Sequence, residues 1–303
     1  MSRAVVVDTD PGIDDAVAIL LALRSPELDI RGITTVAGNI GGATTTRNAG
    51  RILALAGRSD IPVIAGASAP LSRKGLDTVD IHGGDGLGGV AFPEPLAAPR
   101  DGDAINWMAE LLDAEPSGSI DILALGPLTN IARLLCDHPD AARRIGRVVA
   151  MGGAIHERGN IGPRSEFNMA ADPEAAAIVF AAGVPLVLVP LDVTRKVRAT
   201  RAYTAALRAS GKAEAIASAD LIDAYFQSTE GGESRPLHDP CVVVLALAAN
   251  LFGTETVPLA VDVGDGPDAG ALAIVPDGPA VTVATSVDAA AALALLAERL
   301  SAA

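Results

Sequence analysis

Apolar and polar positions alternate along the chain in blocks that are typical of an α/β protein. Residues 4–7 are a continuous apolar run, as in a buried strand, and residues 16–23 form a longer apolar run that predicts a buried helix. By the same reasoning, further strands are predicted at 28–36, 61–66, 120–125, 147–151 and 184–190. Helices are predicted at 44–56, 102–114, 173–182, 200–228 and 287–301, and from Pro240, where Asp239 can cap the first turn. Residues 67–100 contain many Gly, Pro and Asp and predict a long irregular loop.

This alternation predicts an α/β fold with a single open, mostly parallel, Rossmann-like sheet and helices on both faces. Two or three strands between residues 256 and 286 would add a mixed or antiparallel edge. The sequence contains no linker rich in Ser, Pro or Gly, no low-complexity run and no internal repeat. We therefore expect one domain over residues 1–303.

The charge of the chain narrows the range of partners. A formal net charge of −14 argues against nucleic acid or an anionic membrane, because phosphate groups are bound by Lys and Arg. Only three residues precede the first strand, and no uninterrupted apolar stretch is long enough to span a membrane, so we expect a cytoplasmic protein. Cys136 and Cys241 lie in apolar helical patterns, which favours two buried free thiols over a disulfide, although a disulfide stays open.

Candidate chemistry is concentrated directly after the first strand. Residues 8–15 read Asp-Thr-Asp-Pro-Gly-Ile-Asp-Asp, and carboxylates this crowded repel one another unless a positive charge offsets the repulsion. Oxygen ligands alone point to calcium or magnesium. The position also fits a binding site, because ligands of open α/β sheets bind beyond the carboxyl ends of the strands.

Other polar groups follow later strands and can converge with this run if the strands are parallel. They are Asn39, the backbone carbonyl of Leu125, the segment from Met151 to Asn160, the side chains of Glu166 and Asn168, and the pair His238 and Asp239. Carboxylates and a carbonyl suit calcium, whereas Asn and Glu side chains suit the hydroxyl groups of a polyol.

At these positions the chain resembles the nucleoside hydrolase family, in particular its inosine–uridine-preferring branch. The resemblance covers roughly residues 4 to 241 and rests on an ordered set of short blocks: 8–15, Ala-Gly-Asn at 37–39, His-Gly-Gly-Asp-Gly-Leu-Gly at 82–88, Gly-Pro-Leu-Thr-Asn at 126–130, Met-Gly-Gly at 151–153, Glu-Phe-Asn at 166–168, Asp-Pro-Glu-Ala at 172–175 and His-Asp-Pro at 238–240.

The resemblance implies an ion site and a base for the reaction. Ca²⁺ would be bound by the carboxylates of Asp10, Asp15 and Asp239 and by the backbone oxygen of Leu125. Asp14 would be the general base that activates a calcium-bound water.

It also implies a nucleoside pocket. Asn39, Asn160, Glu166 and Asn168 would hold ribose hydroxyls, and Met151 and Phe167 would line the sugar pocket. His82 and His238 would lie toward the nucleobase. Because imidazole titrates near neutral pH, we expect His238 to protonate the leaving base, with His82 as an alternative or a helper. We also expect residues 223–237, including Tyr225, to form a lid near the base.

The resulting expectation is an enzyme that hydrolyses the N-glycosidic bond of ribonucleosides to free base and ribose by direct attack of water. The preferred base, purine or pyrimidine, stays open, and the resemblance implies a homodimer or homotetramer. One alternative is a metal-dependent nucleoside- or ribose-binding protein without turnover. A second is a phosphatase in which the first Asp of Asp8-Thr9-Asp10 attacks phosphorus, but Gly12 and the additional carboxylates do not fit that motif.

Overall fold

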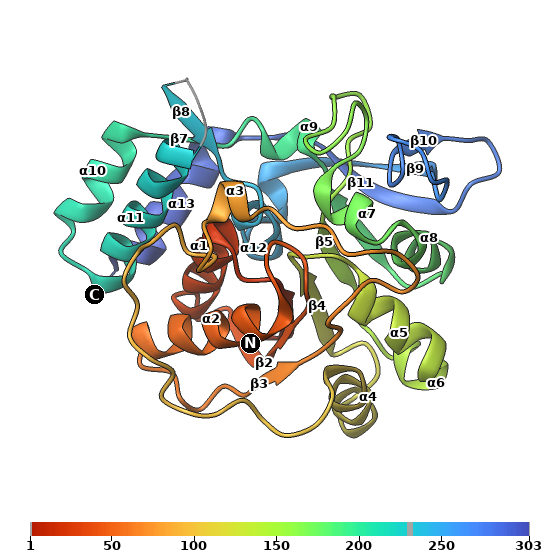
Figure 1. The fold of residues 1–303 in the computed structure, drawn as a ribbon, viewed down its shortest axis with the longest axis horizontal. Coiled ribbons are helices and arrows are strands. Elements are labelled where there is room, and N and C mark those ends of the chain that lie inside the picture. Colours follow the sequence, from red (N-terminus) through yellow and green to blue (C-terminus); the bar gives the residue numbers. More distant parts are fainter. Residues whose placement is uncertain (1, 229–232, 303) are drawn as a thin grey trace.

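A nine-stranded sheet forms the centre of the part of the chain that the computed structural model describes, residues 2–228 and 233–302 (Figure 1). Its strand order is β10-β9-β11-β6-β5-β4-β1-β2-β3. The strands are β1 (Arg3–Thr9), β2 (Leu28–Thr35), β3 (Val63–Ala65), β4 (Ile120–Ala124), β5 (Val148–Met151), β6 (Leu186–Val189), β9 (Phe252–Val261), β10 (Leu272–Ile274) and β11 (Ala280–Val287).

The sheet is parallel from β11 to β3, and β9 pairs antiparallel with both β11 and β10. The prediction of a mostly parallel sheet with an antiparallel edge is therefore confirmed. Successive side chains of β1 point to opposite faces: Val5 and Val7 join one apolar core, and Val6 joins the other. Burial on both faces explains why this strand is an uninterrupted apolar run.

Helices cover the two faces of the sheet and form a separate apolar core on each. The first face carries α1 (Ile13–Leu23), α2 (Gly42–Leu55), α10 (Arg201–Ala209), α11 (Ala213–Ser228), α12 (Pro240–Leu247) and α13 (Ala289–Ser301). The second face carries α4 (Ala104–Ala114), α5 (Thr129–Asp137), α6 (Pro139–Ala142) and α8 (Pro173–Ala181).

Short elements complete the fold beyond the carboxyl ends of the parallel strands. They are α3 (Val79–His82), α7 (Phe167–Ala171), α9 (Leu191–Thr194), and the two-stranded antiparallel pair of β7 (Arg198–Thr200) and β8 (Ser234–Pro236). A 3₁₀ turn at Ala249–Leu251 leads into β9.

Several expectations from the sequence need correction. Cys136 is exposed on α5, so the prediction of two buried thiols is wrong for this residue, while Cys241 is buried and both are free. Residues 67–100 are mostly irregular as predicted but include the single turn α3. The helix α6 was not predicted, and neither was the β7–β8 pair, whereas α5 coincides with the helical pattern around Cys136.

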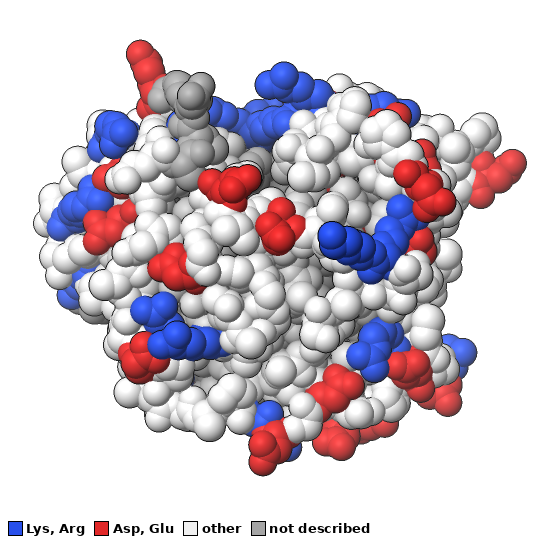
Figure 2. All heavy atoms as spheres, in the orientation of Figure 1, with Lys and Arg blue, Asp and Glu red and all other residues white. Residues whose placement is uncertain are grey.

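The surface carries charges of both signs. On the face shown in Figure 2, Lys and Arg side chains lie in small separate groups among Asp and Glu side chains. Within residues 2–228 and 233–302, none of the helices combines the length and apolarity required to cross a membrane.

Close packing between β2 and α4 gives a test of the fold. A Cβ added to Gly32 would lie 2.4 Å from the indole ring of Trp107, which is itself buried. We expect Gly32→Ala to lower the free energy of unfolding by about 1–3 kcal/mol, because the ring has no free space into which it can move. Chemical denaturation measures this change, and Gly266→Ala, whose new Cβ would meet nothing within 4 Å, is the matched control. Equal stability of both variants would contradict the packing described.

Candidate active site

The carboxyl ends of β1, β2, β4 and β5 meet at one edge of the sheet, where the polar groups that follow them line a cavity of about 70 Å³. Most of the predicted site residues line this cavity: Asp14, Asn39, His82, Leu125, Met151, Asn160, Glu166, Phe167, Asn168, His238 and Asp239. Asp10 and Asp15 are fully buried next to it. The parallel topology thus brings together residues that are more than two hundred positions apart in the sequence.

Three carboxylates form a tight buried group. Asp14, Asp15 and Asp239 each offer an oxygen, and these oxygens all lie within 4.8 Å of one another. Asp14 and Asp15 come from the first turn of α1, and Asp239 directly precedes α12, which packs against α1. Asp239 makes no side-chain capping bond to α12, which corrects the expectation that it caps that helix.

Asp10 supplies a further carboxylate with one unsatisfied oxygen. Its Oδ2 accepts a hydrogen bond from the backbone N–H of Asn39 at 2.6 Å, whereas Oδ1 is buried and has no hydrogen-bond partner among the described residues. A Cβ on Gly38 or Gly126 would collide with this carboxylate, so both glycines are needed for the backbone to approach it. A buried anionic oxygen without a donor is what a cation site requires, and the residues present therefore fit a metal ion.

Asp15 is oriented by a set of donors. The Thr9 hydroxyl donates to Oδ1 at 2.6 Å, and the Gly12 N–H and the Asn39 amide donate to Oδ2 at 3.0 Å each. The Thr78 hydroxyl in turn donates to the Asn39 Oδ1 at 2.8 Å. Both the nitrogen and the oxygen of the Asn39 amide are therefore hydrogen-bonded to protein groups. Asn39 is thus part of the acidic cluster as well as of the pocket wall.

Burial shifts the protonation of the cluster. It raises the pKa of Asp14 from the usual 3.8 to about 7, with the charge of Asp15 as the next cause. It also raises the pKa values of Asp10 and Asp239, and repulsion from neighbouring carboxylates adds to this effect. A divalent cation would reverse these shifts, because it favours the charged form of every carboxylate around it.

The opposite wall of the pocket is built around Glu166. This buried side chain accepts hydrogen bonds from the N–H groups of Gly153, Asn168 and Met169 at 2.9, 3.0 and 3.2 Å, and so caps α7. Burial nevertheless raises its pKa above the usual value. The amide of Asn168 donates to the Leu125 carbonyl oxygen at 2.7 Å, which leaves the second lone pair of that oxygen for another partner.

Asn160 and Phe167 close the same wall. Asn160 lies in the loop after β5, and its Oδ1 accepts a hydrogen bond from the Phe167 N–H at 2.9 Å. The Asn160 side chain is therefore fixed by the start of α7, although the residue is exposed.

Both predicted histidines line the pocket as neutral imidazoles. The Ile13 N–H donates to Nδ1 of His82 at 2.9 Å, and the Thr194 hydroxyl lies 2.7 Å from Nδ1 of His238. Burial lowers the pKa of His82 to about 4 and that of His238 to about 3, where neighbouring arginines add to the effect. The expectation that His238 titrates near neutral pH does not hold for this conformation.

Two of the sequence blocks that carry the resemblance, 126–130 and 172–175, support the site without lining it. Asn130 donates to Asp8 Oδ1 at 2.7 Å and to the Thr35 carbonyl, and its own oxygen accepts from the Ala67 N–H. Asp172 caps α8 and accepts hydrogen bonds from the Thr129 hydroxyl at 2.7 Å and the Leu71 N–H at 2.9 Å. These bonds hold β1, β2, α5 and the 67–100 loop together beneath the pocket.

Sequence reasoning did not single out Thr78 and Ile81, which line the pocket from the segment around α3. Tyr225, expected in a lid, does line the pocket from α11. The rest of that predicted lid falls in part on residues 229–232, which lie outside the described residues.

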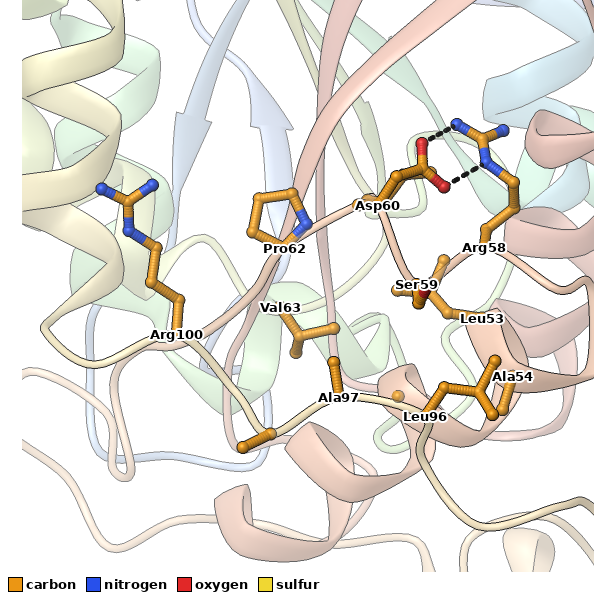
Figure 3. Close-up of a pocket in the computed structure, with 13 residues that line it drawn as sticks. Leu53, Ala54, Arg58, Ser59, Asp60, Pro62, Val63, Leu96, Ala97 and Arg100 are labelled. Atoms are coloured by element: carbon orange, nitrogen blue, oxygen red, sulfur yellow. Dashed lines mark hydrogen bonds and ion pairs between the residues drawn. The ribbon is translucent and has the colours of Figure 1, made fainter.

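A second cavity of about 290 Å³ lies at the β3 edge of the sheet, between β3, α2 and residues 96–100 (Figure 3). Its acidic side chain, Asp60, is paired with Arg58 through two hydrogen bonds of 2.8 Å. Because this pair neutralises itself, the carboxylate-lined pocket is the stronger candidate for catalysis.

Comparison with known proteins agrees with this geometry. The family model for inosine-uridine preferring nucleoside hydrolases matches residues 5–294. The pyrimidine-specific ribonucleoside hydrolase RihA of Citrobacter koseri is 45% identical over 258 residues, which covers 84% of this chain and 82% of that protein. RihA of Escherichia coli O139:H28 is 44% identical over 260 residues, with the same coverage.

Solved structures give the same picture. The plant nucleoside hydrolase PpNRh1 matches with a TM-score of 0.94 and 34% identity, covering 100% of both chains. The purine-preferring ribonucleoside hydrolase from Gardnerella vaginalis matches with a TM-score of 0.92 and 30% identity, covering 99% of this chain and 98% of its own.

The chain belongs to the inosine-uridine preferring nucleoside hydrolase family. It is a ribonucleoside hydrolase, an enzyme that cleaves the N-glycosidic bond of nucleosides. This enzyme class does not support either alternative raised by the sequence, a binding protein without turnover or a phosphatase.

The raised carboxylate pKa values predict how the stability of the metal-free protein depends on pH. Between pH 3.8 and about 7, Asp14 loses its proton in the unfolded chain but keeps it in the folded one, so the free energy of unfolding falls as pH rises. The raised pKa values of Asp10 and Asp239 act in the same direction, whereas the lowered pKa values of His82 and His238 oppose the fall below pH 6.5. We therefore expect the melting temperature without metal to fall by about 3 °C or more between pH 6.5 and pH 8.

Thermal unfolding in a chelating buffer measures this slope. Asp239→Asn removes one repulsive charge and should flatten it, and added calcium should raise the melting temperature most at the higher pH. A metal-free protein that becomes more stable from pH 6.5 to pH 8 would contradict the account of the cluster.

Proposed function

We propose that this enzyme is a calcium-dependent hydrolase of pyrimidine ribonucleosides in which Asp14 is the general base. The observation that carries the proposal is the buried group of Asp14, Asp15 and Asp239 beside the unsatisfied Oδ1 of Asp10. Asp10, Asp15, Asp239 and the Leu125 carbonyl would hold the ion. When bound, calcium supplies a Lewis acid that fixes vicinal hydroxyls and makes a nearby water molecule more acidic.

The residues of the chain account for the remaining steps. Asp14 accepts the proton of the attacking water, and the bound ion would keep this carboxylate in the charged form that a base requires, although burial alone raises its pKa. Asn160, Glu166 and Asn168 hold ribose hydroxyls, while Met151 and Phe167 exclude water from the sugar. The surrounding carboxylates stabilise the positive charge that develops on the ribose as the bond to the base breaks.

The departing base gains electrons and is stabilised by a donor. His82 and His238 both line the pocket, and Nδ1 of each ring contacts the protein, which leaves Nε2 of each ring for the pocket. Because both imidazoles are neutral, we assign them as N–H donors to the base, with His238 as the principal one. Attack by water on this geometry needs no covalent sugar intermediate.

The preference for pyrimidines is supported by the more similar relatives. Proteins named pyrimidine-specific are 43–45% identical to this chain, whereas the relative named purine-preferring is 30% identical. The aromatic side chains Phe167 and Tyr225 are the ones that line the described pocket, which offers little surface on which a purine could stack.

Three further statements stay predictions of the sequence. They are the single-domain organisation over residues 1–303, the homodimeric or homotetrameric state and the cytoplasmic location.

The role of Asp14 can be tested by substitution. We expect Asp14→Ala to keep the fold and most of the substrate affinity but to lower kcat by about 10²–10⁴-fold, because no group replaces the base. Steady-state kinetics with uridine, and calorimetric binding to the inactive variant, measure the two effects. Asp29→Ala, an exposed carboxylate on β2, is the matched control, and near wild-type turnover of Asp14→Ala would rule out the assignment.

Metal and base preference can be tested together in a reducing-sugar assay on uridine, cytidine, inosine and adenosine. We expect kcat/KM for the pyrimidine nucleosides to exceed that for the purine nucleosides by about tenfold or more. A chelator should abolish release of ribose, and calcium should restore it better than magnesium, because calcium accepts more oxygen ligands and a less regular geometry than magnesium does. Full activity in the chelator would refute the metal assignment, and equal rates on all four substrates would refute the preference.

A further inference from the structure

Thr194 is a buried residue that touches the proposed base-side donor without lining the pocket. It ends α9, the single turn that follows β6, and its relative exposure is 0%. Its hydroxyl oxygen lies 2.7 Å from Nδ1 of His238. Figure 1 shows α9 beside the loop that follows β5, above the carboxyl ends of the parallel strands.

Counting protons assigns the direction of this hydrogen bond. Within the described part of the chain, Nδ1 of His238 is the partner of the Thr194 hydroxyl, and no second acceptor for that hydroxyl is present. If Nδ1 carried the imidazole proton, the buried hydroxyl proton of Thr194 would have no acceptor, which is costly. Thr194 therefore donates, Nδ1 accepts, and the proton of His238 is on Nε2.

His82 shows the same arrangement with a different donor. The backbone N–H of Ile13 can only donate, so Nδ1 of His82 must accept and Nε2 must carry the proton. Both histidines thus line the pocket as the Nε2–H tautomer. A backbone N–H fixes this tautomer in His82, and a side-chain hydroxyl fixes it in His238. The backbone donor is present whatever residue stands at position 13, whereas the donor to His238 depends on the side chain at position 194.

We propose that Thr194 is a positioning residue that holds His238 as an Nε2–H donor directed at an acceptor atom of the departing base. This inference rests on the proposed function, in which His238 stabilises the leaving base. A carbonyl oxygen or an unprotonated ring nitrogen of the base is the matching partner. Loss of the Thr194 hydroxyl frees the ring to turn and to place its proton on Nδ1, which leaves no donor toward the base.

Two other residues of the same segment hold the loop after β5 through separate bonds. Asp192 accepts hydrogen bonds from the N–H groups of Ile155 and His156 at 2.9 and 2.8 Å, and Arg195 donates to the Gly159 carbonyl at 2.9 Å. These bonds hold the loop that carries Asn160 and involve no atom of the Thr194 hydroxyl. A substitution that removes only that hydroxyl therefore isolates its effect on His238.

The test compares two leaving groups in Thr194→Val, Thr194→Ser and His238→Ala. Uridine needs a donor to its base, whereas 4-nitrophenyl β-ribofuranoside releases a stabilised anion that needs none. We expect Thr194→Val to lower kcat on uridine by about 10–100-fold, with little change in KM, and to change kcat on the nitrophenyl riboside by less than about threefold. Thr194→Ser should restore the rate on uridine, and Thr194→Val should add little to the loss in His238→Ala.

Thr45→Val is the matched control, because Thr45 is a buried helical threonine on α2 whose hydroxyl donates to the Gly42 carbonyl. Equal losses of Thr194→Val on both substrates, or a Thr194→Ser variant as slow as Thr194→Val, would overturn the positioning role. A His238→Ala variant that shows no dependence on the leaving group would instead refute the donor role of His238 within the proposed function.

A measurement on the unchanged enzyme keeps the proposal testable if the valine variant does not fold. The ¹⁵N chemical shifts of the His238 ring distinguish a protonated Nε2 from a protonated Nδ1, with His238→Ala giving the assignment. We expect the Nε2–H form, and a predominant Nδ1–H form would overturn the proposal.

Discussion

Electrostatic repulsion among buried carboxylates is the constraint on which the rest of this structure depends. Asp10, Asp14, Asp15 and Asp239 lie in a site from which water is largely excluded, and burial raises the pKa values of Asp10, Asp14 and Asp239. A fold without a ligand would be more stable with apolar residues in these places. The close approach of these carboxylates becomes favourable when a cation binds. Without the cation, the folded protein keeps an arrangement that favours binding at the expense of its own stability.

The scaffold makes this crowding possible by supplying backbone and side-chain donors to each acid. Asp15 and Glu166 accept several hydrogen bonds each, and Asp8 and Asp172 are held by Asn130 and Thr129 of the same helix. Parallel strands end at one edge, so a few short loops deliver all of these groups. Rigid placement of charge suits the proposed mechanism, in which positive charge develops on the ribose, since no reorganisation would be needed during the reaction.

Much of this could be predicted from the sequence, and the failures have physical causes. Apolar runs such as 4–7 and 120–125 identified the strands of a parallel sheet, and the acidic run after the first of them identified the site. Residues such as Thr194 and Thr78 could not be found, because their roles come from contacts made only in the folded chain with His238 and Asn39. Cys136 was placed wrongly because an apolar pattern around a residue does not fix the side of the helix on which it lies. The low pKa of His238 likewise depends on burial, which its neighbours in sequence do not reveal.

The four-residue turn α9 has a consequence for how substrate range can diverge among such enzymes. Asp192 within this turn and Arg195 directly after it hold the loop that carries Asn160, while Thr194 contacts His238, the proposed donor to the base. A substitution that displaces this turn would therefore act on two parts of the pocket at once. Ile81 and Tyr225 line the same pocket from α3 and α11, so substitutions there would reshape its wall and leave the contacts of α9 in place.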